Sequence, residues 1–242
     1  MNPRKLAVSA SMFLCICLAG CGGGSKPAPT ATTPEQESAK AQFDSQVKIA
    51  AQTAQTYRAM DNPTLLKNLM DQSAARKEPF NSLAYRELKT RTDVNPDTLA
   101  SLVKTTKNGS ALLPLLLLRR QNEKAYMALP AELRAGVLTD ALANSKTFNT
   151  WGLPHPHAYR EEAAMALVES GRSAYPALKR LLSDKRPAPV FGSQEYMEYQ
   201  RYQYRVCDYA LWFLQSMQEE GQSSALPVAP ADRDALISKL AK

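Results

Sequence analysis

Both histidines of the chain lie in one short turn, and imidazoles are the side chains that most readily bind metals or move protons near neutral pH. His155 and His157 stand between prolines, with Trp151 before them and the carboxylates of Glu161 and Glu162 after them. Histidines and carboxylates together can hold a metal ion, but this segment specifies no third ligand. A proline-rich turn explains the pattern without a function. We therefore expect no metal ligand and no catalytic residue here.

The segment 185–209 is rich in tyrosine and has arginines interleaved with the aromatic residues. Five of the ten tyrosines of the chain lie in it. Tyrosine and arginine are enriched in protein interfaces, and aromatic rings also stack on sugars or bases. Packing against neighbouring helices is the alternative fate of the same side chains. Together with the histidine turn, this segment gives a candidate interaction surface: Trp151, His155, His157, Tyr196, Tyr199, Arg201, Tyr202 and Arg205.

The composition favours a folded, non-enzymatic protein. The chain has 242 residues, of which 44% are hydrophobic, and this fraction is too high for a wholly disordered chain. We find no phosphate-binding glycine loop, no dinucleotide-binding glycine pattern, no zinc-protease helix and no local serine-hydrolase signature. Two histidines are a thin supply of general bases, and Cys207 has none near it in sequence. We expect no enzyme and no cofactor, with Cys207 as a buried, inert thiol.

Helix signals dominate from Phe43 onward. Residues 43–59 are expected to form one helix, and Asn62 and Asn95, each followed by proline, are expected to cap the next ones. The apolar run 111–118 is too short to span a bilayer and predicts a buried helix. No segment alternates β-branched and polar residues, so no sheet is expected.

Apolar positions repeat at an offset of 79 residues, with a weaker repeat at 40 residues before the later copy. The matching positions are Phe80, Ala84, Leu88, Leu99, Leu102 and Val103, and then Tyr159, Ala163, Leu167, Leu178, Leu181 and Leu182. The segment Arg160 to Asp184 resembles one HEAT-type repeat, and residues 205–217 resemble the opening helix of a following repeat. The resemblance implies an all-α solenoid of helical hairpins, an architecture that presents extended binding surfaces.

The N-terminus has the pattern of a secretory signal peptide. A basic start precedes an apolar run over residues 6–19, which is shorter than the roughly 20 residues of a membrane-spanning helix. The sequence Leu-Ala-Gly-Cys at 18–21 resembles the lipobox of bacterial lipoproteins. This resemblance implies cleavage before Cys21, acylation of that cysteine and a lipid anchor in the cell envelope. Gly22 after the cysteine implies the outer membrane.

We therefore expect a signal peptide over residues 1–20, the acylated Cys21 with a flexible tether over 21–42, and a HEAT-like all-α domain over 43–242. Removal of the signal leaves 28 basic and 23 acidic residues, a net charge of +5, and leaves Cys207 as the one thiol. The expected function is a non-enzymatic interaction or scaffolding module in the envelope, with a protein partner and no nucleic acid. The alternative is a glycan or small-molecule binder that uses the turn 151–159 and the segment 194–209.

Overall fold

The computed structural model describes residues 34–74, 82–106, 110–154, 159–190, 192–218 and 225–240. The chain divides into two compact units, Met1–Ile49 and Ala50–Lys242. The expected signal peptide, Cys21, and both His155 and His157 lie outside the described residues.

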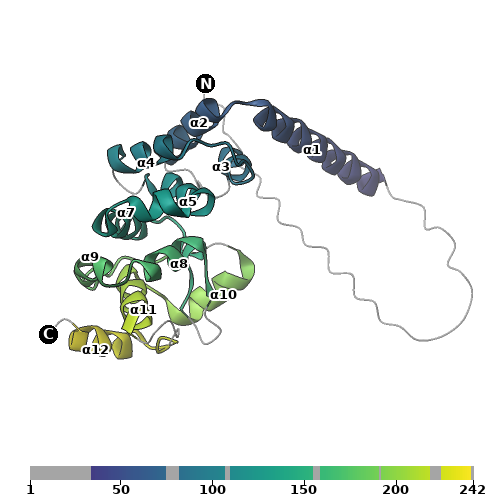
Figure 1. Cartoon of the computed structure of the whole chain (residues 1–242). Helices are drawn as coiled ribbons and strands as arrows, with labels where there is room; N and C mark the ends of the chain where they lie inside the picture. The colour runs from purple at the N-terminus through teal and green to yellow at the C-terminus, as the bar shows by residue number, and fades with distance from the viewer. Residues whose placement is uncertain are drawn as a thin grey trace, which may run out of the picture. The chain divides into compact units, whose positions relative to one another are not determined.

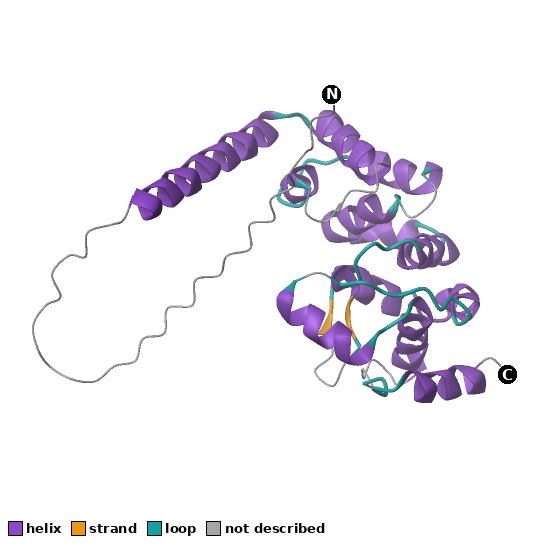
Figure 2. Cartoon of the chain, turned by 180° about the vertical axis from the view of Figure 1, so that it is seen from behind, coloured by secondary structure: helices purple, strands orange, loops and turns teal. Residues whose placement is uncertain are grey.

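The described part of the chain is helical, which confirms the predicted all-α class (Figure 1). The helices are α1 (Pro34–Ala59), α2 (Asn62–Ala74), α3 (Leu83–Leu88), α4 (Pro96–Thr105), α5 (Leu112–Gln121), α6 (Glu123–Ala128), α7 (Ala131–Ala143), α8 (Glu162–Glu169), α9 (Tyr175–Leu181), α10 (Ser193–Tyr202), α11 (Val206–Gln218) and α12 (Pro230–Leu240), with the 3₁₀ turns η2 (Asn149–Trp151) and η3 (Gly171–Ala174). The one departure is a small antiparallel ribbon of β1 (Gly152–Leu153) and β2 (Tyr159–Arg160), drawn in orange in Figure 2. Strands of two residues are too short to show a sequence alternation, so the ribbon could not be predicted.

Helix α1 begins earlier than the sequence pattern indicated. The tether was expected to continue to residue 42, whereas the helix already starts at Pro34. Residues 34–42 consist mainly of glutamate, glutamine, alanine and lysine, which are strong helix formers, and a proline suits the first helical turn. The absence of apolar periodicity there therefore marked an exposed helix.

Two helix starts show how the caps act. Asn95 accepts hydrogen bonds from the backbone amides at the start of α4, at 2.8 Å from the amide of Asp97, as predicted. The start of α2 is capped one residue before the predicted Asn62. There Oδ1 of Asp61 accepts the backbone amide of Thr64 at 2.9 Å, and the hydrogen bonds from Thr64 lower the pKa of the Asp61 carboxyl.

The apolar core of the unit Ala50–Lys242 is built by helices that follow one another along the chain. Helix α5 packs on α4, α6, α7 and α8, and α9 lies against α7 and α11. The run 111–118 is buried, as predicted, and no helix among the described residues is long and apolar enough to cross a membrane. The most extensive packing of α4 and α9 is with the helices that come after them, α5 and α11, rather than with the first helices of the predicted hairpins.

Candidate functional site

Trp151 belongs to the core and offers no face to a ligand. Its side chain is fully buried, and its Nε1 donates a hydrogen bond to Oγ of Ser145 at 2.6 Å. Its ring meets the ring of Phe213 edge-on, with 6.0 Å between the centroids. The expectation that Trp151 forms part of a binding surface is therefore wrong, because η2 turns its ring inward onto α11. The neighbouring His155 and His157 lie outside the described residues.

Three tyrosines of the segment 185–209 are also buried. The rings of Tyr202 and Tyr204 stack, with 5.1 Å between their centroids. The hydroxyls of Tyr204 and Tyr209 donate hydrogen bonds of 2.8 Å to the carbonyls of Pro154 and Gly152, and burial raises the pKa of the Tyr204 phenol. These contacts fix the β1 segment against α11. The predicted surface role of Tyr202 is thus wrong, and packing, the alternative interpretation, describes these side chains.

The segment around α10 is an excursion whose two ends are joined by backbone hydrogen bonds. The amide of Ala188 donates to the carbonyl of Tyr204 at 2.8 Å, and the amide of Val206 donates to the carbonyl of Arg186 at 3.0 Å. Pro187 and Arg205 form an isolated β-bridge between these two bonds. The predicted insertion therefore exists and leaves the core through a narrow, fixed base.

A buried charge network lies beneath this base. Asp208 is fully buried, and it accepts hydrogen bonds of 2.9 Å from the backbone amide and from Nη2 of Arg205. The same Nη2 lies 2.9 Å from Asp234, and the guanidinium of Arg205 lowers the pKa of the Asp234 carboxyl. Arg205 was expected on the interaction surface, but these two carboxylates hold it in an internal ion pair.

Arg233 is the functional support that the sequence analysis missed. Its side chain is fully buried, and its Nε forms an ion pair with Oδ2 of Asp208 at 3.1 Å. Its guanidinium donates hydrogen bonds to the carbonyls of Pro227, Val228 and Tyr202 at 2.7–2.9 Å and lies over the ring of Tyr204. Arg233 thus ties α12 to the end of α10. A single arginine in a polar terminal helix carries no sequence signal for this role.

The end of α10 is held in an unusual conformation. Gln203 has a φ of +48°, which lies in the left-handed region that residues with a side chain seldom adopt. Its amide closes the helix by donating to the carbonyl of Tyr199 at 2.7 Å. Arg233 binds the carbonyl just before it, so the buried network fixes the direction in which α10 leaves the core.

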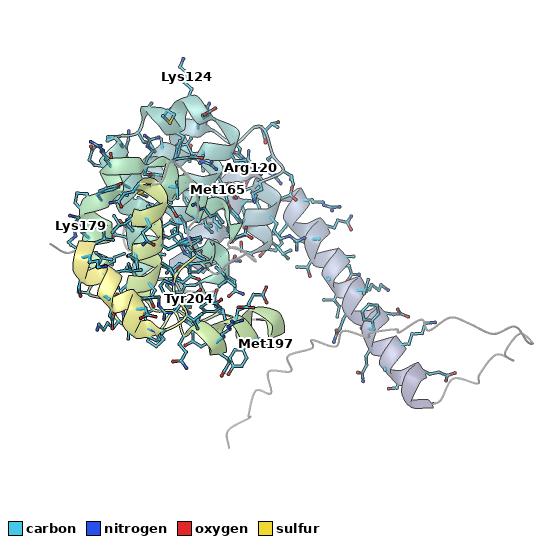
Figure 3. The ribbon with its side chains drawn as sticks, turned by 90° about the horizontal axis from the view of Figure 1, so that it is seen from below. Arg120, Lys124, Met165, Lys179, Met197 and Tyr204 are labelled. Carbon is cyan, nitrogen blue, oxygen red and sulfur yellow. The ribbon has the colours of Figure 1, made fainter. Side chains whose placement is uncertain are left out.

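The outer side of α10 carries the remaining candidates from the predicted surface. We call Tyr196, Met197, Tyr199 and Arg201 the α10 face. Tyr196 is 51% exposed and Met197 is 73% exposed, and Met197 lies on the outside of the molecule in Figure 3. The rings of Tyr196 and Tyr199 lie 6.4 Å apart, and the exposed guanidinium of Arg201 lies over the ring of Tyr202 at 5.5 Å. Exposed aromatic and methionine side chains thus gather on one short helix.

Two groups elsewhere could suggest chemistry, and their surroundings argue against it. Burial raises the pKa of the Cys207 thiol to about 11, which keeps the thiol protonated and unreactive at neutral pH. Glu162 lies 3.1 Å from Nζ of Lys89 and 3.4 Å from the hydroxyl of Tyr85, and burial raises the pKa of that phenol. This cluster joins α3 to α8. Within the described ranges, no group of three histidine, cysteine, aspartate or glutamate side chains could hold a metal ion.

No known protein family, curated protein or solved structure matches this chain. The α10 face therefore takes its meaning from its own exposure, chemistry and support.

Proposed function

We propose that this chain is a lipid-anchored protein of the bacterial envelope whose helical body binds a protein partner through the α10 face, without catalysing a reaction. The lipobox-like sequence ending at Cys21 supports the anchor at the outer membrane. The repeat offset and the chain-order packing of the helices support an array of HEAT-like helical pairs. The observation that carries the binding function is the exposure of Tyr196 and Met197 on a helix with a fixed base.

The residue types on the α10 face suit a protein partner. Tyrosine, methionine and arginine are enriched in protein interfaces, and a few such side chains supply most of the binding free energy. Methionine adapts its shape to an apolar pocket, and tyrosine adds a large ring with a polar end. The half-buried Glu195 and Glu198 lie on the same helix and provide a polar rim. The expected partner surface therefore has an apolar pocket for Met197 and Tyr196, surrounded by polar groups.

The support beneath α10 favours recognition because it limits what binding must order. The backbone bridge between Pro187 and Arg205 and the bonds of Arg233 hold both ends of the excursion before any partner arrives. A preorganised surface loses less conformational entropy on binding than a loose loop. The stored conformation at Gln203 fits the same interpretation, since backbone strain persists where the surrounding structure enforces it.

The experiment is affinity isolation of the intact chain from membranes, with quantitative mass spectrometry of the proteins retained. The test variant is Tyr196→Ala/Met197→Ala. The matched control is Met127→Ala/Met165→Ala, which removes two exposed methionines from α6 and α8. We expect one protein to be retained by the wild type and the control and to fall at least about tenfold with the test variant, as for interface residues worth about 1.4 kcal/mol or more. Equal retention by all three chains would refute the α10 face as the binding surface.

A further inference from the structure

A second surface, on α9, carries basic side chains and hardly any apolar ones. In the run 171–181 the side chains of Ala174 and Leu178 point into the core, so helical geometry places Arg172, Lys179 and Arg180 together on the outer side. All three are exposed, and Lys185 follows just beyond the helix with its side chain 66% exposed. We call Arg172, Lys179, Arg180 and Lys185 the α9 face.

Carboxylates neutralise little of this charge. Across the described ranges no carboxylate lies within ion-pair distance of Arg172, Lys179 or Arg180. Lys185 reaches Asp234 only at 3.5 Å, and an exposed pair of this kind contributes little. Arg186 is different, because Asp184 binds it directly and lies beside it in the sequence, so we do not count it in the face. The α9 face therefore has a concentrated positive charge that is open to a partner.

We propose that the α9 face docks on the anionic phospholipid headgroups of the membrane that holds the anchor, an inference that rests on the proposed acylation of Cys21. A row of cations on a convex helix suits a plane of phosphates, since attraction to such a plane needs no pocket. An acidic protein is less favoured because strong protein interfaces need buried aromatic or apolar anchors. None of the large exposed hydrophobic side chains of the described residues lies between 171 and 186.

The placement of the two faces allows both to be occupied. Helices α9 and α10 lie on opposite sides of α11 in two views turned by 180° about the vertical axis (Figures 1 and 2). Lys179 and Met197, labelled in Figure 3, are correspondingly far apart across the body. Docking through α9 would therefore leave the α10 face directed away from the bilayer. The anchor makes docking an intramolecular step, so a modest affinity of the α9 face is enough.

The test uses the intact acylated chain in vesicles of phosphatidylcholine alone or with added phosphatidylglycerol. A polarity-sensitive dye is placed on the α9 face through Ser183→Cys or, as a control, on α10 through Gln200→Cys. Ser183 and Gln200 are exposed, and Cys207 is buried and so is not labelled. We expect the emission of the dye at Ser183 to shift to the blue with phosphatidylglycerol only, and the dye at Gln200 to stay unchanged in both vesicles. Added salt should reverse the shift because it screens exposed charges.

Charge variants test which residues act. Lys179→Ala/Arg180→Ala should lower the docking constant about 25-fold, from about fivefold for each cation near an anionic surface. Lys104→Ala/Lys124→Ala removes the same charge from exposed positions on α4 and α6 and should leave docking unchanged. Equal losses in the two variants would show a response to net charge and would overturn the assignment to α9.

The outcomes separate this inference from the proposed anchor. A chain that floats with both kinds of vesicle but shows no emission change at Ser183 overturns the docking and leaves the anchor intact. A chain that floats only with phosphatidylglycerol contradicts the anchor and supports the α9 face. A chain that floats with neither contradicts both. A response at Ser183 to soluble polyphosphate or polyglutamate, but not to phosphatidylglycerol, overturns the membrane as the partner.

Discussion

Replacing Arg233 with methionine should destabilise the C-terminal part of the body. The substitution keeps much of the side-chain volume but removes the charge that lies 3.1 Å from the fully buried Asp208. It also removes the donors to the carbonyls of Pro227, Val228 and Tyr202. Asp208 keeps its bonds from Arg205, so its carboxylate does not become wholly unpaired.

The size of the effect follows from this partial loss. Removing one partner of a buried ion pair costs about 3–5 kcal/mol of the free energy of unfolding. Because Arg205 remains, we expect the lower end of that range, about 3 kcal/mol. For a domain of this size a loss of 1 kcal/mol lowers Tm by about 2–4 °C, so Tm should fall by about 6–12 °C.

Urea unfolding followed by the helical circular dichroism signal measures this loss, with thermal unfolding as a second readout. The matched control is Lys239→Met, an exposed residue on the same helix, which should change the free energy of unfolding by less than about 0.5 kcal/mol. If Arg233→Met costs no more than Lys239→Met, the buried network does not hold α12 and the end of α10 as argued above.

Three further predictions concern the same region. Tyr204→Phe leaves the buried carbonyl of Pro154 without its 2.8 Å donor and should lower the free energy of unfolding by about 1–2 kcal/mol in urea titrations; no change would contradict the packing role of that hydroxyl. Because burial raises the pKa of Cys207 to about 11, iodoacetamide at pH 8 should modify the native thiol far more slowly than the urea-unfolded one, and equal rates would contradict its burial. The pKa of Asp234 is lowered by Arg205, so their pair should stabilise the fold above the ordinary aspartate pKa of about 3.9 and lose this effect as the pH falls through the lower folded value; Asp234→Asn should therefore reduce the stability difference between pH 6 and pH 3, which circular dichroism can follow, and an unchanged difference would argue against the pair.

Local patterns predicted much of the fold because they act within a few residues. Asn95 before a proline defined the start of α4, and the apolar run 111–118 had to be buried. The prolines after Asp184 correctly marked the beginning of an excursion from the helical body. In each case the deciding contact or constraint lies within about one helical turn of the residue that signals it.

The candidate site was harder to predict because tertiary packing decides which aromatic and arginine side chains face inward. Trp151 and Tyr202 have the same residue types as an exposed binding surface, and only their packing on α11 and on Tyr204 shows them as core. Arg205 and Arg233 form an internal network because Asp208 lies between them, although Arg233 is 25 residues away in sequence. Such long-range partners leave no periodic or spacing signal in the chain.

Site-specific photo-crosslinking in living cells tests the α10 face most directly. A photoreactive amino acid replaces Met197 or, as a control, Met127, which is also an exposed methionine but lies on α6. We predict one discrete protein adduct from position 197, its loss when Tyr196→Ala is added, and its absence from position 127. The same adducts from both positions, or none from position 197, would contradict a protein partner bound at the α10 face.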